Sequence, residues 1–373
     1  MKVGLDARFL SKIDQGTASY TSQLVKEFSS ILRNDELILL NKNNIQQWGN
    51  EQNINHGKLQ SNFTPFNVLY GYRRAEQKHR LDILHTNYLT SIHKSRTKKI
   101  ITIHDILFRT HAEFFPPKLR LGVNLLSKLS LPKADHIITV SEYSKSKIEE
   151  FYPFLKNKVS VIYEAASSDF FYIKDRDRVR SQIAESFGIK NQYILFVGRF
   201  APIKNIEVLV DWFCDRYGGK NTMKLVLVGR MDPAFPSSNL EKLIFSNPDI
   251  CVLSDICNKS LNLLYNGARF FYFASHGEGF GLPILESMAT GCPVLTSDKT
   301  SCPEVAGDAG MLVDSRDRDA IFASLDNLAK NDKLLSDMSQ AGFLRAKEFS
   351  WKKCALDTYD LYKKIIDEGS YTA

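Results

Sequence analysis

Over nearly its whole length, the chain alternates short apolar runs with segments of helical periodicity, and this pattern restricts the fold more than any other feature. The runs that we predict to be strands are residues 2–5, 36–40, 83–85, 100–103, 136–140 and 159–163, followed by 193–197, 224–228, 250–253, 270–273 and 294–296. Short continuous apolar strands separated by helices are typical of parallel sheets that are covered on both faces. The two series of runs therefore predict an α/β chain with two doubly wound domains.

The length of the chain also favours two domains, because 373 residues are more than one hydrophobic core usually supports. Residues 167–190 separate the two series and form a charged stretch with helical periodicity and no strong strand. We therefore expect an N-terminal domain over residues 1–167 and a C-terminal domain over residues 168–350. The last part, residues 351–368, has helical periodicity and follows the second series.

Composition argues against several classes of protein. No run approaches the ~18 apolar residues of a membrane-spanning helix. Asp6 and Arg8 lie where a signal peptide would be apolar, so we expect the first residues to form a strand. The six cysteines contain no C-x-x-C pair, which argues against a disulfide framework or a zinc site and fits a reducing, cytoplasmic environment.

Two regions carry much of the positive charge. Residues 72–99 have eight basic side chains against two acidic ones, and residues 118–133 have four basic side chains, no acidic one and six leucines. A basic helix with an apolar stripe is typical of a helix that lies on an anionic membrane. A buried helix whose lysines reach water along their aliphatic stems explains the pattern equally well, and both interpretations stay open. Nucleic acid is not expected as a partner, because the regions contain no recognisable reading motif and no interleaved stacking aromatics.

Two carboxylates bracket a glycine-rich turn between Glu278 and Glu286, where the sequence is EGFGLPILE. Glycines let the backbone come close to a ligand, and Pro283 favours the start of a helix whose N-terminus attracts anions. Both carboxylates can face the same bound molecule. The pattern suits a ligand with an anionic middle and hydroxyl groups at each end, such as a nucleotide-sugar.

Other polar residues directly follow predicted strands, where ligands bind in doubly wound sheets. Arg199 and Lys204 flank a turn after strand 193–197, and together they could hold a diphosphate and stabilise it as a leaving group. A pair of solvated surface cations is the alternative. His104 follows strand 100–103, and Gly16 lies in a small-residue turn that leads into a helix. By itself, a lone histidine or a glycine turn is weak support for a site.

Competing motifs are absent. The sequence contains neither G-x-x-x-x-G-K-[ST] nor G-x-G-x-x-G, which argues against a P-loop phosphotransferase and a dinucleotide-binding loop. Glu278 and Glu286 could form a hydrolytic acid/base pair. Their position on a turn and the adjoining helix, with separate phosphate-binding cations, makes glycoside hydrolysis the weaker interpretation.

Taken together, these residues resemble the retaining glycosyltransferases of family 4, group 1. The segment from Glu278 to Glu286 is similar to the E-x7-E signature of that family. The resemblance covers nearly the whole chain, through Gly198-Arg199 with Lys204-Asn205, His104-Asp105, residues 134–144 and residues 303–310. It implies a GT-B fold, in which two Rossmann-like domains face a cleft and a C-terminal helix, residues 351–373, crosses back to the first domain.

The resemblance also implies roles for the site residues. Arg199 and Lys204 would bind the donor diphosphate, and Glu286 would bind the nucleotide ribose. Glu278 would lie beside the hydroxyls and the anomeric region of the sugar, and His104 would contact the transferred sugar. The backbone near the sugar would be that of Gly279, Phe280, Gly281 and Leu282. Gly16 would approach the phosphates or the acceptor, although Ala18 stands where bacterial mannosyltransferases often have a second glycine.

From this resemblance we predict a retaining hexosyltransferase that needs no metal or cofactor, in which a donor phosphate oxygen takes the proton of the acceptor hydroxyl. The pattern is most similar to mannosyltransferases that use GDP-mannose, with UDP- and dTDP-sugars as alternatives. The expected acceptor is a saccharide, carried on a lipid, in bacterial surface polysaccharide or lipopolysaccharide synthesis at the inner face of the plasma membrane. A nucleotide-sugar epimerase or hydrolase and a non-catalytic saccharide-binding protein are the competing interpretations.

Overall fold

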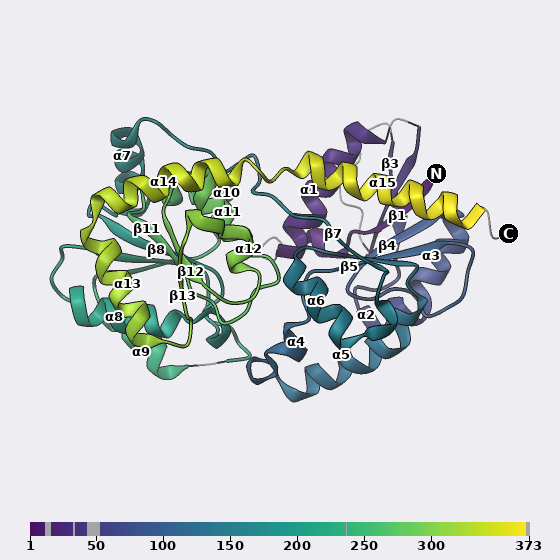
Figure 1. Cartoon of the computed structure of the whole chain (residues 1–373), viewed down its shortest axis with the longest axis horizontal. Coiled ribbons are helices and arrows are strands. Elements are labelled where there is room, and N and C mark those ends of the chain that lie inside the picture. Colours follow the sequence, from purple (N-terminus) through teal and green to yellow (C-terminus); the bar gives the residue numbers. More distant parts are fainter. Residues whose placement is uncertain (12–15, 33, 43–52, 236, 371–373) are drawn as a thin grey trace. The chain divides into compact units, whose positions relative to one another are not determined.

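The computed structural model of the chain describes residues 1–11, 16–32, 34–42, 53–235 and 237–370 (Figure 1). It divides into two compact units. Met1–Glu164 and Ser350–Ala373 form unit 1, and Ala165–Phe349 form unit 2. Each unit is built around one parallel sheet.

Within the described residues, the sheet of unit 1 has seven strands, and every neighbouring pair is parallel. The strands are β1 (Lys2–Asp6), β2 (Glu36–Asn41), β3 (Ile54–Lys58), β4 (Ile83–Asn87), β5 (Lys98–Ile103), β6 (His136–Thr139) and β7 (Val159–Val161). Their spatial order is β3-β2-β1-β4-β5-β6-β7. The order reverses between β1 and β4, and ligands of doubly wound sheets bind beyond the carboxyl ends of the strands at such a point.

The helices of unit 1 come from both ends of the chain. They are α1 (Gly16–Ile31), α2 (Thr64–Phe66), α3 (Tyr72–His79), α4 (Leu107–Thr110), α5 (Pro117–Ser130), α6 (Glu142–Phe151) and α15 (Trp351–Ser370), with a π-helical turn at Asn67–Gly71. α15 lies against α1 (Figure 1). The rings of Phe28 and Tyr362 are 5.8 Å apart in this contact, so the C-terminal helix returns to the first unit as expected.

Unit 2 has a six-stranded parallel sheet within the described residues. Its strands are β8 (Tyr193–Val197), β9 (Lys224–Val228), β10 (Ile250–Leu253), β11 (Phe270–Phe273), β12 (Val294–Ser297) and β13 (Met311–Val313). The order β10-β9-β8-β11-β12-β13 reverses between β8 and β11. The helices are α7 (Arg176–Phe187), α8 (Ile206–Tyr217), α9 (Ser238–Ser246), α10 (Asn258–Gly267), α11 (Leu282–Ala289), α12 (Cys302–Ala306), α13 (Arg318–Lys330) and α14 (Asp332–Ala346).

The apolar runs become strands because helices cover both faces of each sheet. In unit 2, successive residues of β11 are all buried, and Phe196 of β8 packs in the same core as Trp212 of α8. A side chain of this size contributes about 1.5–3 kcal/mol when it is fully buried. The predicted α/β class with two doubly wound sheets is therefore confirmed.

Two strands were missed by the sequence pattern. β3 has the sequence INHGK, in which only the first residue is strongly apolar, and β13 is three residues long. Both lie at a sheet edge. Only one neighbour pairs with an edge strand, so its sequence needs less apolar character than that of a central strand. A strand was predicted over residues 159–163, but β7 ends at Val161 and is shorter than expected.

The exposure of the leucines on α5 tests one of the two interpretations of residues 118–133, that of a buried helix. Four of its leucines are exposed, to 52% at Leu119, 74% at Leu121, 60% at Leu125 and 47% at Leu129. The interpretation as a buried helix is therefore wrong for most of this stripe. No helix among the described residues is long and apolar enough to cross a membrane.

Candidate functional site

In unit 2, the loop after β8 carries Arg199 and Lys204 at the point where the strand order reverses. Asn205 closes the loop with a positive φ of 54°, a left-handed conformation that asparagine tolerates better than most residues. Its amide Nδ2 donates to the carbonyl oxygens of Ala274 and Ser315, at 3.2 and 2.8 Å. These bonds join the loop to the ends of β11 and β13, and thereby position Lys204.

Lys204 and Glu278 form an ion pair, although 74 residues separate them in the chain. Nζ of Lys204 donates to Oε1 of Glu278 at 2.6 Å, and it lies 5.2 Å from the centroid of the Phe273 ring. The two side chains are exposed to only 23% and 11%. The structure therefore brings together a cation and a carboxylate that the sequence placed after two different strands, β8 and β11.

The turn after Glu278 is held by the loop that follows β12. Oγ of Ser301 donates to the carbonyl oxygens of Glu278 and Phe280, at 3.1 and 2.9 Å. Gly281 has φ +107°, and an added Cβ would lie 2.9 Å from Cδ1 of Ile284. A side chain is thus disfavoured there both by conformation and by space. α11 begins at the next residue, Leu282, so a helix N-terminus lies at the same edge of the sheet.

Glu286 lies on α11, one helical turn beyond the glycine turn, and is half-buried. The hydroxyl of Tyr265, on α10, donates to its Oε2 at 3.2 Å. Burial raises the pKa of Glu286 to about 7, and the hydrogen bond from Tyr265 partly opposes this shift. The carboxyl is therefore partly protonated at neutral pH.

Arg199 is exposed, with 55% of its side chain in solvent. Its Nη1 lies 3.6 Å from Oδ2 of Asp232, which follows β9. Asp232 was not predicted from the sequence. Its position shortly after the predicted strand 224–228 was the available signal, because the carboxyl ends of β8 and β9 lie side by side.

In unit 1, His104 follows β5 and is 8% exposed. Its Nδ1 lies 3.1 Å from Oε1 of Glu164, and its Nε2 lies 3.0 Å from Oδ1 of Asn87. The ring of Tyr20 packs edge-on against the imidazole, with 4.9 Å between the two ring centroids. A ring with a proton on each nitrogen donates to both oxygens. A ring with a proton on Nδ1 alone donates to Glu164 and accepts at Nε2 from the Asn87 amide, if that amide is turned so that its NH2 group faces the ring.

Glu164 is buried and was missed by the sequence analysis. It lies beyond β7, in a stretch without any recognised motif. Its carboxylate faces Nδ1 of His104, so it favours a proton on that nitrogen and holds the ring in one orientation. Gly16, by contrast, is the first residue of α1, and a Cβ added there would meet no atom of the described residues within 4 Å.

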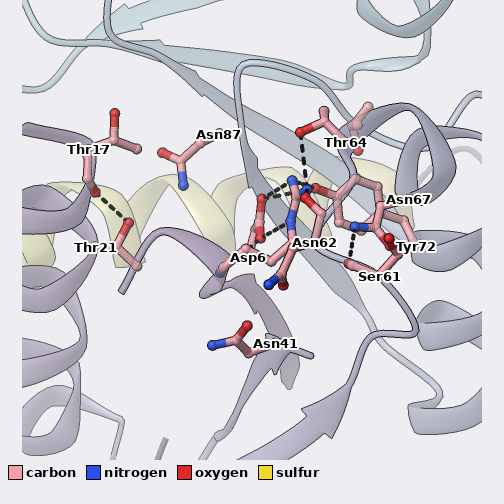
Figure 2. Close-up of polar contacts among 12 residues, drawn as sticks. Asp6, Thr17, Thr21, Asn41, Ser61, Asn62, Thr64, Asn67, Tyr72 and Asn87 are labelled. Carbon is pink, nitrogen blue, oxygen red and sulfur yellow. Dashed lines mark hydrogen bonds and ion pairs between the residues drawn. The ribbon is translucent and has the colours of Figure 1, made fainter. Parts of the chain in front are cut away.

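Polar side chains also gather at the carboxyl ends of β1, β2 and β4. Figure 2 shows Asp6, Asn41 and Asn87 at these three positions. The guanidinium of Arg8 binds both carboxylate oxygens of Asp6, each at 2.8 Å, and the hydroxyl of Tyr72 donates to Asp6 at 2.9 Å. This fully buried ion pair is satisfied on all sides, so it fixes the edge of the sheet rather than binding a ligand itself.

In the described part of the chain, no group of three or more His, Cys, Asp or Glu side chains is placed to hold a metal ion.

Comparison with known proteins identifies both halves of the chain. Residues 191–331 match the family model described as glycosyl transferases group 1, and residues 50–169 match that of glycosyltransferase family 4. The chain is 29% identical to O-antigen chain mannosyltransferase B of Escherichia coli, over 72% of this chain and 71% of that protein. It is 29% identical to O-antigen chain mannosyltransferase RfbU of Salmonella typhimurium, over 51% of this chain and 49% of that protein.

Solved structures show the same fold at low sequence identity. Sucrose-phosphate synthase from Thermosynechococcus elongatus superposes with a TM-score of 0.80 at 19% identity, over 99% of this chain and 100% of that chain. WaaG, a glycosyltransferase involved in lipopolysaccharide biosynthesis, has a TM-score of 0.77 at 12% identity, over 97% and 99%. Anabaena HepE, solved with UDP and glucose, has a TM-score of 0.74 at 14% identity, over 97% and 99%.

Proposed function

Because the chain belongs to the family 4, group 1 glycosyltransferases of the GT-B fold, we propose that it moves a hexose from a nucleotide-sugar to a saccharide acceptor with retention of configuration. The observation that carries this proposal is the pairing of Lys204 with Glu278 at the strand-order reversal of unit 2, where Arg199 lies on the same loop as Lys204. Two cations there match a diphosphate, and the carboxylates match sugar hydroxyls.

In the proposed reaction, Arg199 and Lys204 bind the donor diphosphate and offset the negative charge that grows on it as the bond to the sugar breaks. A donor phosphate oxygen takes the proton of the acceptor hydroxyl, and the new bond forms on the face from which the diphosphate leaves. Lys204 already has a carboxylate partner. In the proposed complex, Lys204 exchanges this partner for the diphosphate, and Glu278 turns toward the sugar hydroxyls.

The two glutamates have different roles in this proposal. Glu286, in its ionised form, accepts hydrogen bonds from the ribose hydroxyls, and Glu278 accepts them from the sugar. The backbone of Gly279, Phe280, Gly281 and Leu282 lies beside the sugar. No metal is required, because the two cations and the N-terminus of α11 supply positive charge. Full activity in the presence of EDTA is the expected result.

His104 is the residue that we assign to the transferred sugar in unit 1. Glu164 acts through it as a positioning residue, since its carboxylate contacts the imidazole. No atom of the described residues lies within 4 Å of the position that a Cβ of Gly16 would take, and an approach to phosphates or acceptor at the start of α1 would require such space.

GDP-mannose is the donor that we favour, because two similar proteins are O-antigen mannosyltransferases. UDP- and dTDP-sugars are the alternatives, and HepE was solved with UDP and glucose. Titration calorimetry with GDP-, UDP- and dTDP-sugars identifies the nucleotide base of the donor. Product stereochemistry then separates a retaining transferase from an epimerase or a hydrolase, and binding without turnover would indicate a non-catalytic saccharide-binding protein.

We assign the acceptor side to a membrane surface, where a lipid-linked saccharide would be reached from the cytoplasmic face. The support is the stripe of Leu121, Leu125 and Leu129 along the exposed side of α5, flanked by Lys118 and Lys128. Residues four apart on a helix lie on one face, so the three leucines form a continuous apolar strip. Apolar side chains edged by lysines suit a surface of anionic lipid.

A further inference from the structure

Unit 2 contains a cavity that the proposed reaction does not use. It has a volume of about 780 Å³ and lies where α7, α10 and α14 meet the amino ends of β8, β11 and β12. Arg199, Lys204 and Glu278 follow the carboxyl ends of β8 and β11. The cavity is therefore at the opposite edge of the same sheet, and its volume is within the ~300–1,000 Å³ of small-molecule sites.

The charged side chains that line this cavity are mostly basic. They are Arg176, Arg180, Lys190 and Arg269, against Asp332 alone. The first turns of α7 and α14 also line it, and a helix N-terminus adds partial positive charge. Such a lining selects an anion with several oxygens, and arginine binds phosphate through two parallel hydrogen bonds.

Arg269 has unused hydrogen-bonding capacity. Its side chain is 13% exposed, and its Nε is buried without a hydrogen-bond partner among the described residues. Nη2 donates to Asp332 at 2.7 Å, but the side chain of Asp332 is 86% exposed and is therefore weakly held. Nη1 makes only a long hydrogen bond, 3.4 Å to Oε1 of Gln192, and a bound phosphate oxygen would be a stronger acceptor for it.

Arg176 is held in place and connects the cavity to α10. Its guanidinium donates to the carbonyl oxygen of Asn266 and lies 4.6 Å from the centroid of the Tyr172 ring. Asn266 lies on α10, and the residue before it, Tyr265, donates a hydrogen bond to Glu286. A ligand that draws on Arg176 therefore acts on the helix that positions Glu286.

We propose that this cavity binds a phosphate- or diphosphate-bearing small molecule, and that its occupancy changes nucleotide affinity at the donor site through α10. The binding itself does not depend on the proposed function. The effect on the nucleotide rests on it, since it requires Glu286 to contact the donor.

Inorganic pyrophosphate is the probe for binding, titrated by calorimetry into Lys204→Ala protein, which lacks one cation of the donor site. We expect one binding event, weakened about ten-fold by Arg180→Ala or Arg269→Ala, as for the loss of a hydrogen bond to a charged group. Arg178→Ala is the matched control, because this exposed arginine of α7 does not line the cavity. Equal weakening by Arg178→Ala, or no binding event, would overturn the site.

The effect on the donor site is measured in wild-type protein as the Kd of GDP or UDP with and without saturating pyrophosphate. Pyrophosphate that competes with the nucleotide at the donor site also raises this Kd. The same measurement is therefore made on Arg180→Ala protein, in which pyrophosphate binding to the cavity is weakened. We expect a cavity-dependent change of about three-fold or more, lost in Arg180→Ala. The same Kd shift in both proteins would refute the coupling. Absence of any nucleotide binding would instead contradict the proposed function, while the pyrophosphate titration would still decide on the site.

Discussion

The ammonium of Lys204 lies 2.6 Å from the carboxylate of Glu278, with both side chains largely shielded from water. One side chain follows β8 and the other follows β11, the two strands between which the sheet order reverses. The pair thus places a positive charge and a hydroxyl-binding carboxylate together where a doubly wound sheet binds its ligand.

Lys204→Ala should lower kcat/KM for the nucleotide-sugar at least about 100-fold, because removing a donor to a developing anion costs about 3–4 kcal/mol. Steady-state rates with the donor identified by calorimetry provide the measurement. Lys242→Ala, an exposed lysine of α9, serves as the control and should retain full activity. Undiminished activity in Lys204→Ala would remove the leaving-group role.

Asp232→Asn should tighten donor binding about two- to five-fold. Asp232 competes with the diphosphate for Arg199, and an ion pair this exposed contributes about 0.2–1 kcal/mol. The measurement is the nucleotide Kd by calorimetry at low salt. Asp215→Asn, which removes an exposed carboxylate from α8, should change nothing. Weaker binding in Asp232→Asn would mean that Asp232 itself holds the donor.

Donor binding should weaken as the pH falls through about 7, since Glu286 then gains a proton and accepts fewer hydrogen bonds from ribose. Glu286→Gln should bind the donor weakly at every pH, without this dependence. Nucleotide Kd values between pH 5.5 and 8.5 test the prediction. A pH dependence that survives in Glu286→Gln would assign the titration to another group.

The raised pKa of Glu286 also predicts that the free energy of unfolding falls as the pH rises, whereas donor binding strengthens. The folded state holds the proton of Glu286 more tightly than the unfolded state does, so the carboxyl stabilises the fold least above pH 7. Glu286→Gln should therefore raise the free energy of unfolding at pH 8 by up to about 1–3 kcal/mol, and the Tm with it. Near pH 4.5 the substitution should have little effect on either quantity. Thermal unfolding at the two pH values is the measurement. A larger gain at pH 4.5 would contradict the assignment.

Glu164→Gln should lower kcat about ten-fold and leave the nucleotide Kd unchanged, because Glu164 orients His104 while the diphosphate is assigned to Arg199 and Lys204. Nitrogen chemical shifts of the His104 ring should show a changed tautomer balance, which a purely structural role would not produce. Glu150→Gln, on the exposed side of α6, is the control. An unaltered ring spectrum with lowered kcat would refute the positioning role.

Replacing Leu121 and Leu125 together by glutamate should abolish flotation of the protein with vesicles that contain anionic lipid. The two leucines are exposed, so the substitution should not affect folding. Leu344→Glu provides the matched control, since Leu344 is 57% exposed on α14 in unit 2. Equal loss of flotation in both variants, or no flotation of the wild-type protein, would exclude α5 as the membrane surface.

Local sequence was sufficient for most of the fold. β8 and β9 begin and end at the predicted residues, because short apolar runs such as those in YILFV and KLVLV are typical of parallel strands buried on both faces. β3 could not be predicted this way, since INHGK depends on pairing with β2 rather than on its own side chains.

By itself, the sequence determined the class of fold, the glycine turn before α11 and the position of Arg199, Lys204 and His104 after particular strands, all of which depend on residues close together in the chain. Only the tertiary structure decided the partners of these residues. Glu278 lies 74 residues from Lys204, and Glu164 lies 60 from His104. The order of strands in the sheets brings such residues together, and strand order is a property of the packed fold rather than of any local pattern. The exposure of the α5 leucines was decided in the same way, since it depends on which elements pack against that helix.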